Sequence, residues 1–475
     1  MNVAERETSS RYREVYHRIR GTIEGGVLKP GDRLPSARTL ANELNAARGT
    51  VETALALLTG EGYIVALGRK GRVVSPILPV FTAAKAGSGR RPAPEVSYAH
   101  LFKDPAPLTP GLPAFDLFPR KLWSQMVSRQ ARRCAAADLT YVDPLGLPRL
   151  RAAIAGYLAV ARGVSCAPEE VFITGGYLSA LALVLRAMTT AGDAAWVESP
   201  GYPLTVRAVE LAGVTPVPIT VDAEGMDVEA GIATVPRAKL AIVAPANQFP
   251  LGVSLSLRRR AALLDWASSA QTWIVEDDYT GEFRHDGWPL PSLKSLDRDD
   301  RVFYTGTFSK TVFPALRLGY LVAPVSQQTR IRDFLYRLDG GRPALEQAIL
   351  AAFISEGHFA RHIMRMRKAY RLRRRGFETA LENVFGDRFH IHPSSGGLQI
   401  VAGLNPTEDD VRLESVAAEA GLRPRALSSM AFGSNGPRGL LLGFGNVSEE
   451  MALPIARRLA EVLPSALAGS PRTAG

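Results

Sequence analysis

Cysteine is scarce in this chain, and long apolar runs are missing. Only Cys134 and Cys166 occur in 475 residues, which argues against a disulfide framework and for a reducing compartment. No stretch approaches the roughly 20 apolar residues that a membrane-spanning helix needs. The polar residues 1–13 lack the apolar core of a signal peptide, and no Cys/His metal pattern is apparent. We therefore expect a cytoplasmic globular protein without a membrane anchor or a metal site.

The chain is long and carries a clear excess of positive charge. A chain of 475 residues with 46% hydrophobic content is too long for one ordinary domain, so two or three are expected. The formal net charge is +11. Such an excess fits a polyanionic partner without establishing one, because net charge sets non-specific affinity rather than fold.

The N-terminal residues predict two short helices and a hairpin. Residues 11–26 repeat apolar side chains every four positions, as an amphipathic helix does. Ser36 is a plausible N-cap for a helix that continues through Leu44, and after a three-residue break a second helix is expected from Arg48 to Leu58. Two such helices with a short turn form a helix-turn-helix unit. Residues 63–66 and 72–75 then predict the strands of a wing.

The run PGDRLPSARTLANELNAARGTV resembles the winged helix-turn-helix of the GntR superfamily, whose second helix enters the major groove of DNA. The charge of residues 1–75, twelve Lys/Arg against eight Asp/Glu, is modest, so the motif carries the DNA prediction. The alternative is a small protein-interaction module with solvated arginines. The resemblance implies DNA contacts by Ser36, Arg38, Arg48, Thr50, Gly68, Arg69 and Lys70.

Glu52 departs from the family pattern, which often has a basic residue there. A carboxylate cannot contact phosphate, so either direct readout is thinner than usual or Glu52 accepts a hydrogen bond from a cytosine amine. Proline and glycine then dominate the sequence, with no persistent period. We expect a DNA-binding domain at 8–76, an interdomain linker at 77–113 and a second domain at 114–468.

From residue 115 onward, short apolar strands alternate with helical stretches. This order predicts an α/β domain with a mostly parallel sheet, in which ligands bind beyond the carboxyl ends of the strands. The expected strands, each followed by a helix, lie at 171–174, 194–197, 240–243, 273–275 and 301–304.

The stretch TGTFSKTVFPALRLGY at 305–320 organises this domain. Thr307, Ser309 and Arg317 surround Lys310, and hydroxyls with an arginine can hold a phosphate. A lysine among them can form a Schiff base with an aldehyde, and pyridoxal phosphate (PLP) carries both groups. Taken alone, the Ser-Lys pair favours a buried βα turn with a surface lysine; the rest of the chain reverses that preference.

Further motifs at the strand ends favour the cofactor interpretation. Together they resemble the fold-type I PLP enzymes, the aspartate aminotransferase-like superfamily. The resemblance implies a Schiff base on Lys310, a pyridinium partner in Asp277, hydrogen bonds to the ring oxygen from Asn247 and Tyr279, and ring stacking on Tyr202. It further implies phosphate contacts from Gly176, Tyr177, Thr307, Ser309 and Arg317, with Tyr141 reaching the phosphate in a partner subunit.

Each of these residues also has a structural explanation. Asp277 could be a helix cap, with Asp278 as the pyridinium partner. Tyr202 and Asn247 could be turn residues, Gly176 and Tyr177 a plain strand–helix turn, and Arg317 the partner of an acid. The arginine that holds a substrate carboxylate in aminotransferases is replaced by Leu441, unless the alignment is shifted and Arg438 does that work. Other candidate substitutes are Arg207, Arg423 and Arg425.

A helix expected at 356–375 is strongly basic, since residues 361–375 contain eight Lys/Arg and no acid. Such a run is usually a solvated face; the alternative is a docking face for DNA or for the winged module.

The whole chain is similar to the MocR/GabR-type regulators, which join a GntR-type winged module to an aminotransferase-like domain. The resemblance implies a bacterial PLP-dependent transcriptional regulator that binds operator DNA. It also implies a homodimer in which the winged module of one subunit packs on the other. The effector is expected to be an amine or PLP itself. The alternatives are an active aminotransferase with a vestigial DNA-binding module, and a vitamin B6-binding protein without DNA specificity.

Overall fold

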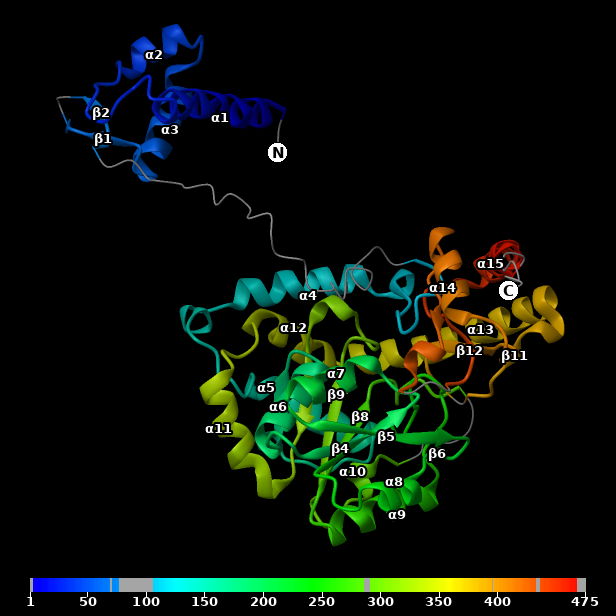
Figure 1. Cartoon of the computed structure of the whole chain (residues 1–475). Coiled ribbons are helices and arrows are strands. Elements are labelled where there is room, and N and C mark those ends of the chain that lie inside the picture. Colours follow the sequence, from blue (N-terminus) through cyan, green and yellow to red (C-terminus); the bar gives the residue numbers. More distant parts are fainter. Residues whose placement is uncertain are drawn as a thin grey trace. The chain divides into compact units, whose positions relative to one another are not determined.

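The computed structural model describes residues 3–68, 71–76, 106–285, 291–394, 396–432 and 436–467. The chain divides into two compact units, Met1–Leu101 and Phe102–Gly475 (Figure 1). Each is described by itself. Arg69 and Lys70 at the expected wing, and residues 77–105 of the expected linker, lie outside the described residues.

The N-terminal unit is a small helical core with a two-stranded antiparallel hairpin. Ile23, Val51 and Leu55 are among the side chains that close the core. The Ser36 hydroxyl accepts a hydrogen bond from the Thr39 amide at 3.1 Å, which confirms it as an N-cap. The elements are α1 Val3–Glu24, α2 Ala37–Glu43, α3 Arg48–Gly60, β1 Ile64–Ala66 and β2 Arg72–Val74.

The larger unit is built on an eight-stranded sheet in the order β3-β10-β9-β8-β7-β4-β5-β6. The inner strands β9, β8, β7, β4 and β5 run parallel, whereas β10 is antiparallel to both of its neighbours and β6 to β5. The strands are β3 Val171–Thr174, β4 Ala194–Ser199, β5 Thr215–Asp222, β6 Gly225–Met226, β7 Leu240–Val243, β8 Trp273–Asp278, β9 Val302–Thr307 and β10 Gly319–Val322.

Helices cover both faces of this sheet. One face packs against α6 and α11, and the other packs against α8, α9 and α10 at one end and α5 and α12 at the other. The helices are α4 Arg120–Arg133, α5 Pro148–Ala161, α6 Tyr177–Met188, α7 Pro203–Leu211, α8 Val228–Thr234, α9 Leu257–Ser269, α10 Leu293–Leu296, α11 Gln328–Leu338 and α12 Ala344–Ser355.

A second, four-stranded antiparallel sheet in the order β11-β12-β14-β13 forms the C-terminal part of the larger unit. It lies beside the first sheet in Figure 1 and packs against α13, α14 and α15. The elements are α13 His358–Phe385, β11 His390–Ile391, β12 Gln399–Gly403, α14 Asp410–Glu419, β13 Arg425–Ala426, β14 Gly439–Gly443 and α15 Ala452–Leu467.

The α/β class and the two-part architecture are confirmed, but three expected boundaries are wrong. β8 extends through Asp278, so the acidic residues are part of the strand rather than of the loop after it. β9 is followed by a turn and the antiparallel β10 rather than by a helix. The basic helix expected at 356–375 is α13, which starts at His358 and continues to Phe385.

Candidate functional site: a buried lysine at the strand ends

Lys310 lies in the turn between β9 and β10. Its ammonium group is enclosed by protein, and burial lowers its pKa to about 8, against an opposing attraction by Asp277. At pH 7 about a tenth of the Lys310 side chains are therefore the neutral amine, far more than for an ordinary lysine, and this is the form that attacks an aldehyde. Lys310 is half-buried in this turn rather than exposed, which argues against the surface-lysine alternative.

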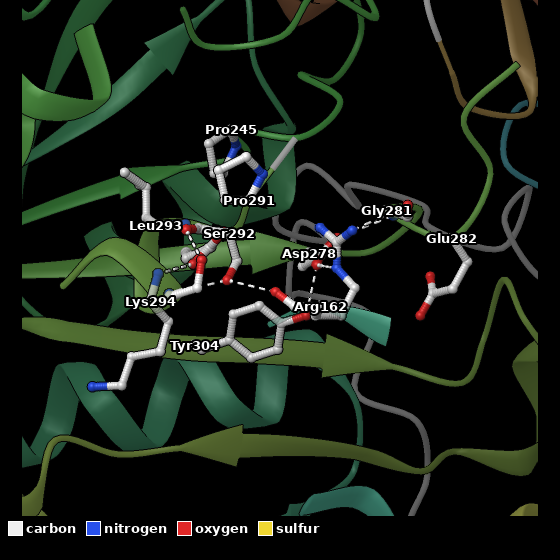
Figure 2. A network of polar contacts seen from close by, with 12 residues as sticks. Arg162, Pro245, Asp278, Gly281, Glu282, Pro291, Ser292, Leu293, Lys294 and Tyr304 are labelled. Atoms are coloured by element: carbon white, nitrogen blue, oxygen red, sulfur yellow. Dashed lines mark hydrogen bonds and ion pairs between the residues drawn. The ribbon is translucent and has the colours of Figure 1, made fainter. Parts of the chain in front are cut away.

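Asp277 and Asp278 project to opposite faces of β8, because successive side chains of a strand alternate. Asp278 accepts hydrogen bonds from Arg162 Nε at 2.6 Å, from the Tyr304 hydroxyl at 2.6 Å and from the Gly281 amide at 3.0 Å. Figure 2 shows this network, with the Arg162 guanidinium between Asp278 and Gly281. Asp278 is thus fully occupied by structural contacts.

Asp277 has an oxygen to spare. Its Oδ1 is buried and has no hydrogen-bond partner among the described residues. Burial, and next the charge of Asp278, raise the pKa of this carboxyl well above its usual range, whereas Lys310 lowers it. A buried carboxylate oxygen without a donor is costly unless a ligand supplies one. Of the two acids, Asp277 fits a ligand's cationic N–H.

Aromatic and amide groups line the cleft in front of Asp277. Tyr202 lies beside Phe249, with 5.6 Å between ring centroids, and remains 37% exposed. Burial, and next the charge of Asp277, raise the pKa of Tyr202 to about 12. Asn247 Nδ2 donates to the Tyr279 hydroxyl at 3.0 Å, while Asn247 Oδ1 is buried without a partner in the described structure. The lining residues are Tyr177, Val197, Glu198, Tyr202, Thr205, Val206, Ile242, Val243, Ala244, Phe249 and Asp277.

Some of the residues expected to hold a phosphate lie near the start of α6. Gly176 is the N-cap, with φ 104°, so the first amides of the helix are free to bind an anion. Thr307 Oγ1 lies 4.0 Å from where a Cβ on Gly176 would be, and it donates to Ser309 Oγ at 3.0 Å. Arg317 follows in a left-handed conformation at φ 50°. No ion pair of Arg317 with an acid occurs in the described part of the chain.

Tyr141 is not brought to this site within one chain. It lies in the loop after residues Ala136–Leu139 and is fully exposed. Its expected contact with a partner subunit stays a prediction.

Leu441 lies in β14 within a small apolar cluster with Val401 and Leu427, against Phe249 of the cleft. Three of the four candidate substitute arginines pair with acids. Arg438 pairs with Asp410 at 3.1 Å, Arg425 with Glu414 at 3.2 Å and Arg207 with Glu210 at 2.7 Å. Arg423 lies in the loop before β13; its backbone amide donates to the Pro107 carbonyl, and its side-chain Nε is buried without a partner among the described residues.

Sequence reasoning missed two residues of the site. Gly111, at φ 72°, lies so close to Lys310 that an added Cβ would stand 2.9 Å from Nζ. It belongs to the stretch that was expected to be linker, and no local pattern marks it. Glu198 shares the cleft with Asp277, and burial raises its pKa to about 8.

In the N-terminal unit, Arg38 and Arg48 are exposed, Thr50 is half-buried, and Gly68 is exposed at the hairpin turn. Ser36 serves as the N-cap of α2. Glu52 accepts a hydrogen bond from Arg72 Nη2 at 2.8 Å, so it links the second helix to a wing strand. No local pattern in the sequence marks this ion pair, which joins residues twenty positions apart.

Comparisons with known proteins agree with both units. Residues 126–435 match the family "Aminotransferase class I and II", and residues 11–74 match "Bacterial regulatory proteins, gntR family". Among solved structures, Pyrococcus horikoshii kynurenine aminotransferase is 27% identical, with a TM-score of 0.71 over 82% of this chain and 98% of that one. The α-aminoadipate aminotransferase LysN from Thermus thermophilus, solved with N-(5'-phosphopyridoxyl)-L-leucine, is 27% identical, with a TM-score of 0.71 over 78% of this chain and 95% of that one. Across the described residues, no helix is long and apolar enough to cross a membrane.

Curated relatives span both units. The probable rhizopine catabolism regulatory protein MocR of Rhizobium meliloti is 34% identical over 92% of this chain and 90% of its own length. The pyridoxine biosynthesis regulator PdxR of Corynebacterium glutamicum is 33% identical over 92% of each chain. TauR of Rhodobacter capsulatus, an HTH-type transcriptional regulator, is 34% identical over 77% of this chain and 79% of its own. The chain therefore belongs to the MocR-type family of transcriptional regulators, in which a GntR-type helix-turn-helix domain is joined to an aminotransferase class I and II domain.

Proposed function

We propose that this regulator holds PLP on Lys310 and senses an amine, or PLP itself. The observation that carries the proposal is the pair of Lys310 and Asp277, a buried amine and a buried carboxylate with an unpaired oxygen, at the edge of an aromatic cleft. When bound, PLP supplies an aldehyde that condenses with amines and a ring that withdraws electrons.

The residues of the cleft fit this group. Asp277 would accept the pyridinium N–H, which satisfies its unpaired oxygen. Asn247 and Tyr279 would donate to the ring oxygen, and Tyr202 would stack on the ring. The phosphate would be held by the amides of Gly176 and Tyr177, the hydroxyls of Thr307 and Ser309, and Arg317.

The N-terminal unit would bind operator DNA through Arg38, Arg48, Thr50 and the wing, as expected of the family. By the same resemblance the working form is a cytoplasmic homodimer. In it, Tyr141 reaches the phosphate bound in the other subunit, and the winged module of one subunit packs on the other. An effector shifts the dimer only if it binds one conformation better than the other.

The chemistry near Leu441 narrows the effector class. The apolar cluster of Val401, Leu427 and Leu441 cannot pair with a carboxylate, and Arg438 is tied to Asp410. We therefore propose an effector without an α-carboxylate, or PLP itself.

A second candidate function is catalysis of transamination. It is favoured by the similarity to aminotransferases, including a 28% identical aromatic-amino-acid aminotransferase of Thermococcus litoralis that covers 75% of this chain. Leu441 argues against it, since a substrate carboxylate has no cation at that position. Turnover of an amino donor with a keto acid would establish this function.

The test compares wild type, Lys310→Ala and the exposed-lysine control Lys121→Ala. Wild type and the control should show the visible absorption of lysine-bound PLP, and Lys310→Ala should not. All three should be assayed for binding to DNA from the gene's own upstream region. If wild type remains colourless after PLP is added, the cofactor proposal is wrong. If it is coloured but amines and PLP leave DNA binding unchanged, the sensing proposal is wrong.

A further inference from the structure

The basic helix α13 exposes a continuous stripe of cations. Among its residues, Arg361, Arg365, Lys368, Arg371 and Arg375 recur every three or four positions and are exposed. Side chains at that spacing lie on one face of a helix. The opposite face is buried through Phe359, Ile363, Met366, Tyr370 and Phe377, among others. We refer to the five exposed cations as the α13 stripe.

Three other basic residues of this helix make contacts that hold the protein's own structure. Arg367 donates to the Glu282 carbonyl at 2.6 Å, Arg373 pairs with Asp116, and Arg374 pairs with Glu378. These three have a structural function, which explains part of the unusual composition of residues 361–375. They do not explain the stripe.

The charges of the stripe are not neutralised. Arg361 donates to His358 Nδ1 at 2.7 Å and Arg365 to the Leu117 carbonyl at 3.0 Å, and both acceptors are uncharged. Lys368, Arg371 and Arg375 form no ion pair with any residue that the structure describes. From Arg361 to Arg375 the helix rises about 21 Å, at about 1.5 Å per residue. Five like charges over that length repel one another and raise the affinity for an anionic partner.

We infer that the α13 stripe is a second, sequence-independent binding surface for the phosphate backbone of DNA. A duplex carries one phosphate per about 3.4 Å of helix axis on each strand, so a row of cations about 21 Å long can face several phosphates. Residues 1–75 carry a formal charge of only +4 out of the chain's +11, so most of the excess lies outside the winged module. The apolar side chains of Met364 and Leu372 are exposed within the stripe. An acidic protein partner, the alternative to DNA, would contact these two side chains as well as the cations.

The salt dependence of DNA binding distinguishes DNA from a protein as the partner of the α13 stripe. The test variant is the full chain with Lys368→Gln, Arg371→Gln and Arg375→Gln. The matched control is Arg186→Gln, Arg237→Gln and Arg298→Gln, three exposed arginines elsewhere in the larger unit. Both variants lose three charges, so they alter the overall field alike. The probes are duplex DNA from the gene's upstream region and a random duplex of the same length, and sedimentation of the free proteins is measured alongside.

Each phosphate contact contributes about 0.9 to the slope of log affinity against log salt, so the stripe variant should lose about 2.7 from the slope on both probes. Between 50 and 200 mM salt, its affinity should fall about 40-fold less than that of wild type. The control should keep the wild-type slope. A further variant, Arg371→Lys and Arg375→Lys with Lys368 unchanged, should keep most of the wild-type salt slope, because a phosphate accepts either cation.

Two results would overturn the inference. If the stripe variant and the control behave alike on both probes, α13 is only a solvated face. If the stripe variant changes the sedimenting species while its salt slope is unchanged, the stripe contacts another protein chain rather than DNA.

Discussion

The ion pair between Arg162 and Asp278 provides the sharpest test of how the candidate site is held in place. Their side chains are only 4% and 2% exposed. Desolvation lowers the pKa of Arg162, but Asp278 and other nearby groups outweigh it, and the pKa is raised above its ordinary value. Removing the guanidinium leaves Asp278 with only Tyr304 and Gly281 as donors, beside the buried Glu276 and Glu282.

An uncompensated buried charge of this kind costs about 3–5 kcal/mol. Unfolding entropy is about 2.1 cal/mol/K per residue, or about 0.8 kcal/mol/K over the roughly 370 residues of the larger unit. Arg162→Met should therefore lower its melting temperature by about 4–6 °C. The exposed pair Arg207–Glu210, in which Arg207 is 62% exposed, serves as the control. Arg207→Met should shift the melting temperature by about 1 °C or less.

The assay is thermal unfolding of the cofactor-free proteins, followed by calorimetry so that the transition of the larger unit can be separated from that of the N-terminal unit. The double variant Arg162→Met/Asp278→Asn should recover much of the loss, because it removes both charges together. If Arg162→Met melts within about 1 °C of wild type, the pair does not stabilise the end of β8 and the reasoning from burial is wrong.

Three further predictions follow from the described contacts. Gly111→Ala places a Cβ 2.9 Å from Lys310 Nζ and should abolish the visible absorption of bound PLP. The control Gly192→Ala, also left-handed at φ 92° but in open space, should retain that absorption, and equal loss in both variants would assign the effect to backbone strain. Uptake of PLP by the cofactor-free protein should become about tenfold faster from pH 7 to pH 9 and then level off, because the neutral amine of Lys310 forms through a pKa of about 8; a rate still climbing at pH 10 would contradict that value. Glu52→Gln and Arg72→Gln should weaken discrimination between operator and random DNA by similar factors, with no further loss in the double variant, since both remove one contact; additive losses would mean that each side chain touches DNA separately.

The local patterns of the sequence predicted most of the fold. β3, β4 and β7 lie at the expected positions because short apolar runs beside glycine and proline are specific for buried parallel strands. The end of β8 was missed because Glu276, Asp277 and Asp278 are charged, and charge normally marks a loop. They remain in the strand because distant groups satisfy them: Glu276 accepts from the Leu293 and Lys294 amides, and Asp278 from Arg162.

In the candidate site too, the residues marked by local patterns were predictable, and those that depend on distant contacts were not. Motif spacing was enough to nominate Lys310, Asp277 and the glycines before α6, because those residues lie close together in the chain or at strand ends. The choice between Asp277 and Asp278 depends on the alternation of side chains along β8, and the end of β8 was not predictable from the sequence. Gly111 and Glu52 depend on contacts across about 200 and 20 positions, and no local periodicity encodes such pairings.

The position of Gly111 against Lys310 has a consequence for what holds the lysine in place. Leu108 forms a bridge with Gly443, and three residues later the backbone passes directly over the lysine amine. Residues 108–111 therefore join the four-stranded sheet to the surroundings of the lysine amine. A substitution that shifts the Leu108–Gly443 bridge should also shift the backbone beside Lys310, although the bridge lies outside the cleft.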